Sequence, residues 1–431
     1  MEKYSKQLKL LSDNLKKIHI VDNSINDSFF KKDIKDIFIK YFEKEYKYFE
    51  KCKNKYNFVD LFCGAGGLSL GLEKSDLFPI LAVDSYKTAT DTYLFNRPYL
   101  NENQVLTTDI KKNHALLNIS APLVVGGPPC QGFSNANKQK KENDERNELY
   151  KYFIEVVANV QPDLVLMENV EGLLKYKEKI ENDFSNNGYI MKPYLLNTKD
   201  FGFPQNRKRV FFIGIKKKHK SRFDKLIGIF ENNLNYHMSN KLNFVLEDAI
   251  SDLPKLKAKT LKNSTYKESN DWGYTISKEM KFNSNYTRLI NNGELSFPLL
   301  NHKTKYNNDR DIEIYSLLEE GDNSTSSSIE HINPYSDRAH MFKDKFFKLK
   351  RKEISKTITA HMYYDCHMYI HPSESRGLTP REAARIQGFP DTYFFTGTPN
   401  EWYRQIGNAV SPLIANIIGM GLKKMLDEIY E

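Results

Sequence analysis

The chain is 431 residues long, and 40% of its residues are hydrophobic. A chain of this length is usually too long for a single hydrophobic core, so we expect two domains. The apolar content excludes a wholly disordered protein. Lysine and arginine exceed the acidic residues by 64 to 55, and the net charge of +9 suits nucleic acid as a partner without establishing it. No signal-peptide pattern and no long uncharged apolar run occurs. We therefore predict a cytoplasmic protein that is not inserted in a membrane.

Residues 1–54 are rich in charged and amide side chains, yet the stretch 28–52 carries apolar residues at helical spacing. Phe30, Ile34, Phe38 and Tyr41 fall on one side of such a helix. We interpret residues 1–54 as an N-terminal helical extension whose apolar face packs on the protein itself. A membrane surface or a partner is the alternative for a basic amphipathic helix.

Short apolar runs then alternate with stretches of helical length. The runs are residues 57–62, 78–84, 122–127, 163–169 and 209–215. This alternation predicts an α/β domain with parallel strands and helices on both faces of the sheet. Ligands bind such sheets beyond the carboxyl ends of the strands, so we expect the chemistry there.

The pattern dissolves into polar sequence between about residues 216 and 350, which predicts a second, less regular domain or a set of long loops. Order returns at 378–390, where Thr379-Pro380 predicts a helix start and Gly388 its end. Residues 405–431 read as a loop followed by a helix with an apolar face.

The first predicted strand runs into a glycine-rich turn with Gly64, Gly66 and Gly67, and Asp84 follows about 20 residues later. Glycines let the backbone approach a ligand closely, and an acid at that distance can hold a ribose. A dinucleotide and S-adenosylmethionine both fit this pattern. Asp60, just before the turn, places a negative charge where a pyrophosphate would lie, which favours a cationic cofactor. Asp109 can meet an adenine amino group from the next strand end.

Cys130 stands in the segment GGPPCQGFS, directly after an apolar run. The two prolines restrict the backbone, which is useful if a nucleophile must be aimed. A buried, inert thiol is the alternative.

Glu168 ends another predicted strand at the same edge of the sheet, where burial would raise the pKa of its carboxyl and keep it able to donate a proton. Arg207 and Arg209, two residues apart before a strand, can point to one side and neutralise anions or assist a thiolate. Ordinary ion pairs are the alternative for these residues.

Four cysteines and a group of histidines raise the question of disulfides or a metal. The cysteines are Cys52, Cys63, Cys130 and Cys366, and they form no C-x-x-C pair. That spacing favours a reducing compartment, and we read Cys63 as structural. The other group is His361, Cys366, His367 and His371. Its spacing fits no standard zinc site, so we expect no metal.

Six segments complete the pattern in a fixed order: DLFCGAGGLSLG, GGPPCQGFS, MENVEGLL, FGFPQNRKRVFFIGI, RGLTPREAARIQGFP and QIGNAVSP. In these segments, from about residue 58 to 425, the chain resembles the DNA (cytosine-5)-methyltransferases of bacterial restriction-modification systems. The resemblance implies a Rossmann-like S-adenosylmethionine-dependent methyltransferase sheet in residues 55–215, completed by residues 401–431. It also implies a second, smaller irregular target-recognition domain in residues 216–400.

The resemblance implies roles for single residues. Phe62 would stack on the cofactor adenine, Asp84 would take the ribose hydroxyls, and Asp109 with Ile110 would frame the base. The remaining cofactor-binding residues would be Asp60, Gly64, Ala65, Gly66, Gly67, Ser85, Pro129, Leu149, Asn408 and Ala409. Asp84 stands where the family often has glutamate, so contact through water is an open alternative.

The catalytic roles follow from the same resemblance. The thiolate of Cys130 would add to C6 of cytosine while Glu168 protonates N3, which makes C5 able to attack a sulfonium methyl group. Arg209 would support the base and Glu168, and Arg207 a phosphate or the nucleophile loop. The cytosine must leave the duplex to reach the thiol.

Double-stranded DNA is therefore the expected substrate, with a cognate restriction endonuclease as a candidate partner and the protein acting as a monomer. The function implied is protection of host DNA. Two alternatives stay open: an RNA (tRNA) cytosine-5 methyltransferase on the same fold, and a non-catalytic DNA-binding regulator. The long polar region favours duplex DNA, because it suits reading base edges in the groove.

Overall fold

The computed structural model describes residues 4–16, 19–20, 27–53, 56–113, 119–129, 149–261, 267–294, 296–341 and 344–431. The chain divides into two compact units. One comprises Met1–Phe42, Phe203–Asn206 and Asn243–Asn408, and the other comprises Glu43–Gly202, Arg207–Leu242 and Ala409–Glu431. The assignment of catalytic and target-recognition domains to residue ranges stays a prediction.

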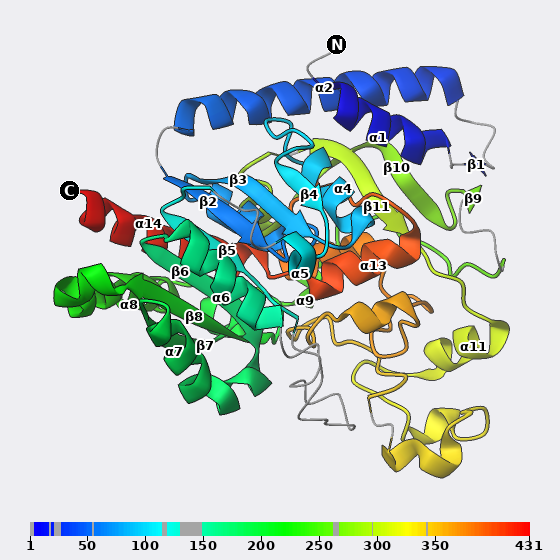
Figure 1. Cartoon of the computed structure of the whole chain (residues 1–431). Coiled ribbons are helices and arrows are strands. Elements are labelled where there is room, and N and C mark those ends of the chain that lie inside the picture. Colours follow the sequence, from blue (N-terminus) through cyan, green and yellow to red (C-terminus); the bar gives the residue numbers. More distant parts are fainter. Residues whose placement is uncertain are drawn as a thin grey trace. The chain divides into compact units, whose positions relative to one another are not determined.

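Seven strands form the sheet of the second unit in the order β4-β3-β2-β5-β6-β8-β7 (Figure 1). They are β2 (Tyr56–Leu61), β3 (Leu77–Asp84), β4 (Val105–Thr107), β5 (Leu123–Gly126), β6 (Leu164–Val170), β7 (Tyr189–Asn197) and β8 (Lys208–Lys216). Neighbouring strands from β4 to β6 pair in parallel, whereas β8 runs antiparallel to β6 and β7. The predicted α/β fold is confirmed, except that the run 209–215 opposes its neighbours.

The strand order reverses between β2 and β5. From β2 the chain builds β3 and β4 to one side, then returns to form β5 on the other side, where Leu61 pairs with Gly126. In open α/β sheets such a reversal opens a crevice at the carboxyl ends of the strands. Because β8 is antiparallel, its first residues reach the same edge, and Arg209 pairs opposite Val170 at the end of β6.

Helices cover the two faces of the sheet, since alternate residues of a strand point to opposite sides. On one face α6 (Leu149–Val160) and α7 (Lys177–Asn186) bury Phe153 and Phe184 against Val124 and Val165. Alternate positions face other helices of this unit: α3 (Gly67–Glu73), α4 (Lys87–Phe95), α8 (Phe223–Ser239) and α14 (Pro412–Tyr430). The short helical segments of this unit are α5 (Ile110–Asn113), η4 (Glu171–Tyr176), η5 (Thr198–Phe201) and η6 (Lys217–Arg222).

The first unit is built from short elements. Its helices are α1 (Ser5–Lys16), α9 (Leu246–Ile250), α10 (Asn285–Ile290), α11 (Asp309–Leu317), α12 (Pro380–Gln387), α13 (Pro399–Asn408) and the 3-10 segments η7 (Ser327–Ile329), η8 (Ser336–Met341) and η9 (Ala360–Tyr363). Its strands pair β10 (Gly273–Lys281) antiparallel with β11 (Ser296–Lys303), and β1 (His19–Ile20) with β9 (Lys267–Glu268). The predicted helix limits around residue 380 are confirmed, because Thr379 caps α12 and Gly388 ends it with a φ of 89°.

The helix predicted over residues 28–52 is α2 (Asp27–Cys52). Phe38 and Phe42 are fully buried, and within the first unit the ring of Phe38 contacts those of Phe297 and Phe394. The apolar face of α2 therefore packs on the protein itself, as expected. Among the described residues, one stretch is long and apolar enough to cross a membrane, Pro399–Tyr430, and 72% of its apolar window is buried, as in a core helix.

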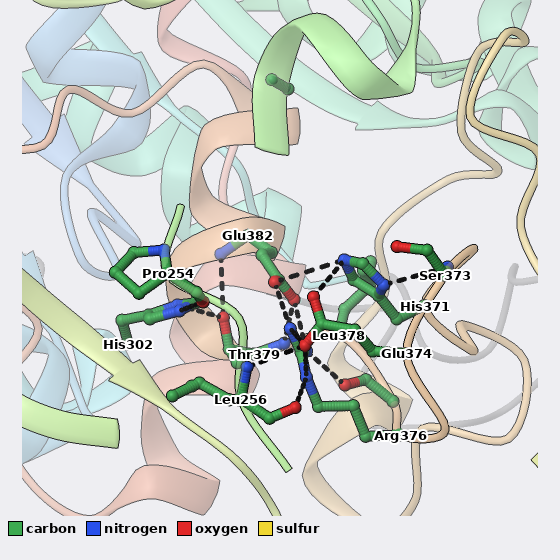
Figure 2. A network of polar contacts seen from close by, with 12 residues as sticks. Pro254, Leu256, His302, His371, Ser373, Glu374, Arg376, Leu378, Thr379 and Glu382 are labelled. Atoms are coloured by element: carbon green, nitrogen blue, oxygen red, sulfur yellow. Dashed lines mark hydrogen bonds and ion pairs between the residues drawn. The ribbon is translucent and has the colours of Figure 1, made fainter. Parts of the chain in front are cut away.

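A buried polar network joins three stretches of the first unit: residues 254–256, His302 of β11, and residues 371–382 (Figure 2). Arg376 donates to both carboxylate oxygens of Glu382 at 2.9 and 2.7 Å, and to Glu374 at 2.9 Å. His302 contacts the carbonyl of Pro254 at 2.9 Å through Nε2 and the hydroxyl of Thr379 at 3.0 Å through Nδ1. Burial lowers the pKa of His302 to about 4. The network thus ties the start of α12 to the loops around it with the histidine neutral.

Candidate active site

The glycine-rich turn after β2 has an unusual backbone. Phe62, Gly64 and Gly66 all have positive φ angles, of 57°, 52° and 85°. A Cβ at Gly66 would lie 2.5 Å from Nη1 of Arg97, so this position requires glycine for space as well as conformation. A Cβ at Gly64 would have no atom within 4 Å, so at that position only the positive φ favours glycine.

Asp84 at the end of β3 holds this turn. Its Oδ2 accepts the backbone N–H of Gly64 at 2.9 Å, and its Oδ1 accepts that of Tyr86 at 2.8 Å. The half-buried carboxylate therefore fixes the turn, and Ser85 beside it is exposed. The structure brings the predicted ribose-binding acid and the predicted glycines together at one strand edge.

Asp60 is enclosed rather than open. Its side chain is 1% exposed and accepts a hydrogen bond from Oγ of Ser69 at 2.5 Å, and that hydroxyl also lies 2.7 Å from the hydroxyl of Tyr93. Burial raises the pKa of Asp60 to about 7. Its contact with a cofactor stays a prediction, and its observed role is to anchor α3. Ser69 lies in the quoted segment DLFCGAGGLSLG and Tyr93 outside every quoted segment, and neither was singled out because nothing in the spacing pairs them with Asp60.

Three of the apolar residues predicted to contact the cofactor lie in or against one hydrophobic cluster of the core. Ile110 belongs to it, and the half-buried side chains of Phe62 and Leu149 pack against it. Asp109 is exposed, and its Oδ1 accepts the backbone N–H of Lys111 at 3.0 Å. The other predicted residues lie as follows: Ala65 and Gly67 buried at the start of α3, Pro129 exposed, Ala409 half-buried, and Asn408 exposed at the end of α13 in the first unit.

Glu168 is the best-defined candidate for proton transfer. Its side chain is 13% exposed at the end of β6, and its Oε1 lies 3.1 Å from Nε of Arg209. Burial raises the pKa of Glu168, and the charges of Arg209 and Arg207 offset part of that rise. A Cβ placed on Gly127 would lie 3.1 Å from Oε2 of Glu168, so the glycine leaves room beside the carboxyl.

Asn169 ties Glu168 to the loop after β5, a role the sequence reasoning missed. Its Nδ2 donates to the carbonyl of Pro128 at 2.9 Å. Cys130 itself lies outside the described residues, two positions beyond this anchor. Asn169 stands next to a predicted catalytic acid on a buried strand, and that unusual polar side chain is the signal that could have found it.

Arg207 fixes neighbouring backbone as well as acting on Glu168. It is 2% exposed, its backbone exchanges hydrogen bonds with Thr198 at 3.2 and 3.1 Å, and its Nη2 donates to the carbonyl of Ala409 at 2.8 Å. Arg209 thus contacts the Glu168 carboxyl directly, whereas Arg207 acts on it only through its charge, and the catalytic roles of both arginines stay predictions. Burial, which raises the pKa, suits this carboxyl to donating a proton to a bound base, whereas the two cations favour its ionised form.

Cys63 in the glycine-rich turn and the group of histidines between residues 361 and 371 have different neighbours. Cys63 is buried with Tyr93, and burial raises the pKa of its thiol. His367 contacts the hydroxyl of Tyr315 at 2.7 Å, whereas His371 lies 3.5 Å from Glu374. In the part of the chain that the structure describes, no three of the His, Cys, Asp and Glu side chains are grouped so as to hold a metal ion.

Comparison with known proteins places these residues in a family context. The model of the C-5 cytosine-specific DNA methylase family matches residues 56–424. The type II methyltransferase M.DdeI of Desulfomicrobium norvegicum is 34% identical over 391 residues, covering 84% of this chain and 87% of that protein. The type II methyltransferase M1.HphI of Haemophilus parahaemolyticus is 31% identical and covers 88% and 89%. The crystal structure of a putative DNA modification methyltransferase from an E. coli prophage matches with a TM-score of 0.63 and 26% identity, covering 86% of this chain and all of that one.

Proposed function

The chain belongs to the C-5 cytosine-specific DNA methylase family, and we propose that it transfers the methyl group of S-adenosylmethionine to C5 of a cytosine flipped out of duplex DNA. It is a cytosine DNA methyltransferase of the type II restriction-modification kind, so DNA is its substrate. We propose further that it acts as a cytoplasmic monomer that protects host DNA from a cognate endonuclease.

One observation carries the proposal. The enclosed carboxyl of Glu168 stands at the carboxyl edge of the sheet with Arg209 3.1 Å away and a raised pKa. Asn169, the next residue, anchors the Pro-Pro loop that leads to Cys130. Addition to a pyrimidine ring requires a thiol that can attack C6 and a carboxyl that can donate a proton to the ring.

The residues have defined roles in that reaction. The thiolate of Cys130 forms a bond to C6, and Glu168 donates its proton to N3, so the C5–C6 electron pair becomes available at C5. Arg209 holds the Glu168 carboxyl in place. After C5 has gained the methyl group, its proton passes to a base, the C5–C6 double bond re-forms and the bond between C6 and sulfur breaks to release the thiolate. N3 then returns its proton to the Glu168 carboxylate.

The residues around the glycine turn fit S-adenosylmethionine. Asp84 would hold the ribose diol while its carboxylate also accepts the N–H of Gly64, and Phe62 and Leu149, half-buried against Ile110, would contact the purine. Gly64 and Gly66 keep the backbone free of side chains at the turn. When bound, the cofactor supplies an electrophilic methyl group on a sulfonium.

A matched pair of substitutions tests the carboxyl. Glu168→Gln should bind cofactor normally and lose at least about a hundredfold in turnover, since general acid catalysis contributes on that order. Glu171→Gln is the control, because Glu171 follows the same strand but its side chain is 47% exposed, 3.7 Å from Lys208. Equal turnover of both variants would contradict the role of Glu168.

Covalent trapping tests the thiol. Duplex DNA containing 5-fluorocytosine should form an adduct with Cys130 in the presence of cofactor, because fluorine cannot leave as a proton does. Cys130→Ala should form none, and tRNA in place of DNA should yield neither methylation nor adduct. Methylation of tRNA but not of duplex DNA would support the RNA reading, and an unimpaired Cys130→Ala protein would support a non-catalytic regulator.

A further inference from the structure

The end of α2 has no part in the roles assigned so far. Residues 43–52 of this helix belong to the second unit, and the family match begins after them, at residue 56. The ring of Phe49 in this segment stacks on that of Tyr99, with centroids 4.3 Å apart and an interplanar angle of 7°. Both rings meet Phe78 of β3 edge to face, at 5.3 and 5.9 Å. The end of α2 is therefore packed on the unit that carries the glycine-rich turn.

Tyr99 connects these rings to a buried ion pair. Its hydroxyl donates to Oε1 of Glu73, the last residue of α3. The same carboxylate accepts Nε and Nη2 of Arg97 at 2.6 and 3.1 Å, and Arg97 is 1% exposed. A planar guanidinium that bonds both carboxylate oxygens has a fixed orientation. Tyr99 therefore acts on Arg97 through one shared carboxylate.

Arg97 in turn contacts the glycine-rich turn. Its Nη2 donates to the carbonyl of Gly66 at 3.0 Å, and its guanidinium carbon lies 3.8 Å from the ring centroid of Tyr93. The same carbonyl accepts the N–H of Leu70 at 2.9 Å, in the first turn of α3. One side chain thus fixes the direction of a backbone group in the turn.

The polar atoms of this arrangement do more than fill the core. A buried ion pair adds little net stability over apolar side chains of similar volume. Here it orients one carbonyl in a turn where Phe62, Gly64 and Gly66 all have positive φ. Holding such a turn in place before a ligand arrives lowers the entropy lost on binding.

We propose that the end of α2 positions the glycine-rich turn for the cofactor through a relay of contacts. The relay consists of Phe49, Tyr99, Glu73 and Arg97. This rests on the proposed function, because it takes the turn as the site of S-adenosylmethionine. The four are positioning residues, since each acts on the turn through its neighbour. The N-terminal extension is then a working part of the cofactor site.

Substitutions at the two ends of the relay test it. Phe49→Ala removes the stacked ring and should weaken S-adenosylmethionine binding about fivefold by calorimetry, since an aromatic pair is worth about 0.5–1.5 kcal/mol. Arg97→Lys keeps the charge but loses the planar fork, and should weaken binding about tenfold. Lys47→Ala, at an exposed position of the same helix, and Arg222→Lys, in the pair with Glu428, are the controls. Both controls should bind within about twofold of the wild type.

Amide hydrogen exchange of the free protein gives a readout that needs no cofactor. Residues 63–70 should exchange faster in Phe49→Ala than in the wild type, whereas exchange in β5 and β6 should not change. Phe49→Tyr keeps a stacked ring, so it should restore both the affinity and the slow exchange. A general loss of stability would instead raise exchange throughout the sheet, and that result would contradict the relay.

A double variant tests whether the two ends act through the same contacts. Phe49→Ala combined with Arg97→Lys should bind the cofactor about as weakly as Arg97→Lys alone, because both changes release the Gly66 carbonyl. Losses that multiply would show two independent effects and contradict the relay.

Failure of the relay can be told apart from failure of the proposed function. If the wild type binds S-adenosylmethionine and Phe49→Ala leaves either the affinity or the exchange of residues 63–70 unchanged, the relay is refuted. If the wild type binds none, the proposed function fails, and exchange alone tests the link. Faster exchange in Phe49→Ala would then still support it, and unchanged exchange would refute it.

Discussion

Replacing Gly71 by alanine tests how closely α3 and α14 approach each other in the second unit. A Cβ at this position would lie 2.4 Å from Cβ of Ala415, 2.5 Å from the carbonyl oxygen of Pro412 and 2.6 Å from the backbone N of Asn416. Ordinary van der Waals contact begins near 3.4 Å. Two of these three atoms are backbone, so no side-chain rotation relieves the overlap and α14 must move.

The magnitude follows from two opposing terms. Alanine favours a helix over glycine by about 1 kcal/mol, and overpacking a filled contact costs about 1–3 kcal/mol or more. With overlaps of this size the cost falls at the upper end, so Gly71→Ala should lower the free energy of unfolding by about 2 kcal/mol. Gly228 in α8 has no atom within 4 Å of the added Cβ, so Gly228→Ala should raise it by up to about 1 kcal/mol.

Urea unfolding followed by far-UV circular dichroism measures both changes. The two tryptophans, Trp272 and Trp402, belong to the first unit, so their fluorescence does not report on this contact. Amide hydrogen exchange in α14 should also rise in Gly71→Ala alone. Equal stability of the two variants would refute the argument that α3 and α14 meet through a glycine that must remain unsubstituted.

The other predictions concern the first unit and the site. Burial holds the pKa values of His302 and His371 at about 4, below the value of 6.5 for an exposed histidine, so the unfolded chain takes up these protons first. The free energy of unfolding should therefore fall as pH drops from about 6.5 to about 4, by up to about 3 kcal/mol for each histidine. Urea unfolding followed by tryptophan fluorescence measures this change, and an unchanged free energy of unfolding over this pH range would contradict the prediction. Asp84→Ala should weaken cofactor binding at least about tenfold by calorimetry, because a charged hydrogen bond is worth about 1.5–3 kcal/mol, and an unchanged affinity would exclude Asp84 from the pocket. Asn169→Ala should slow formation of the 5-fluorocytosine adduct on Cys130 while leaving cofactor affinity intact, and a normal trapping rate would show that the Pro128 anchor is dispensable.

The sequence indicated the sheet well where strands are continuous apolar runs, as in β5 and β6. It missed β7, an edge strand interrupted by Pro193 and carrying Lys192, because edge strands tolerate proline and polar side chains. It also missed α8, which lies inside the polar region but carries the buried side chains of Leu226 and Phe230. The antiparallel direction of β8 could not be predicted, because an apolar run reads the same for a parallel and an antiparallel strand.

Some residues of the candidate site could likewise be predicted from the sequence and others could not. Asp84 and Glu168 were predicted because acids at the ends of apolar runs are conspicuous. Asn169 and Arg207 also act through main-chain carbonyls 41 and 202 residues away, of Pro128 and Ala409, and nothing in the spacing reveals such pairs. Folding alone brings them together.

Nucleoside mass spectrometry of DNA from cells expressing this chain, with sequencing of the modified positions, tests the central claim most directly. The account predicts 5-methylcytosine at one recurring site, present with the wild type and absent with Glu168→Gln. DNA that carries no 5-methylcytosine, or that carries a methyl group on an exocyclic nitrogen instead, would contradict it.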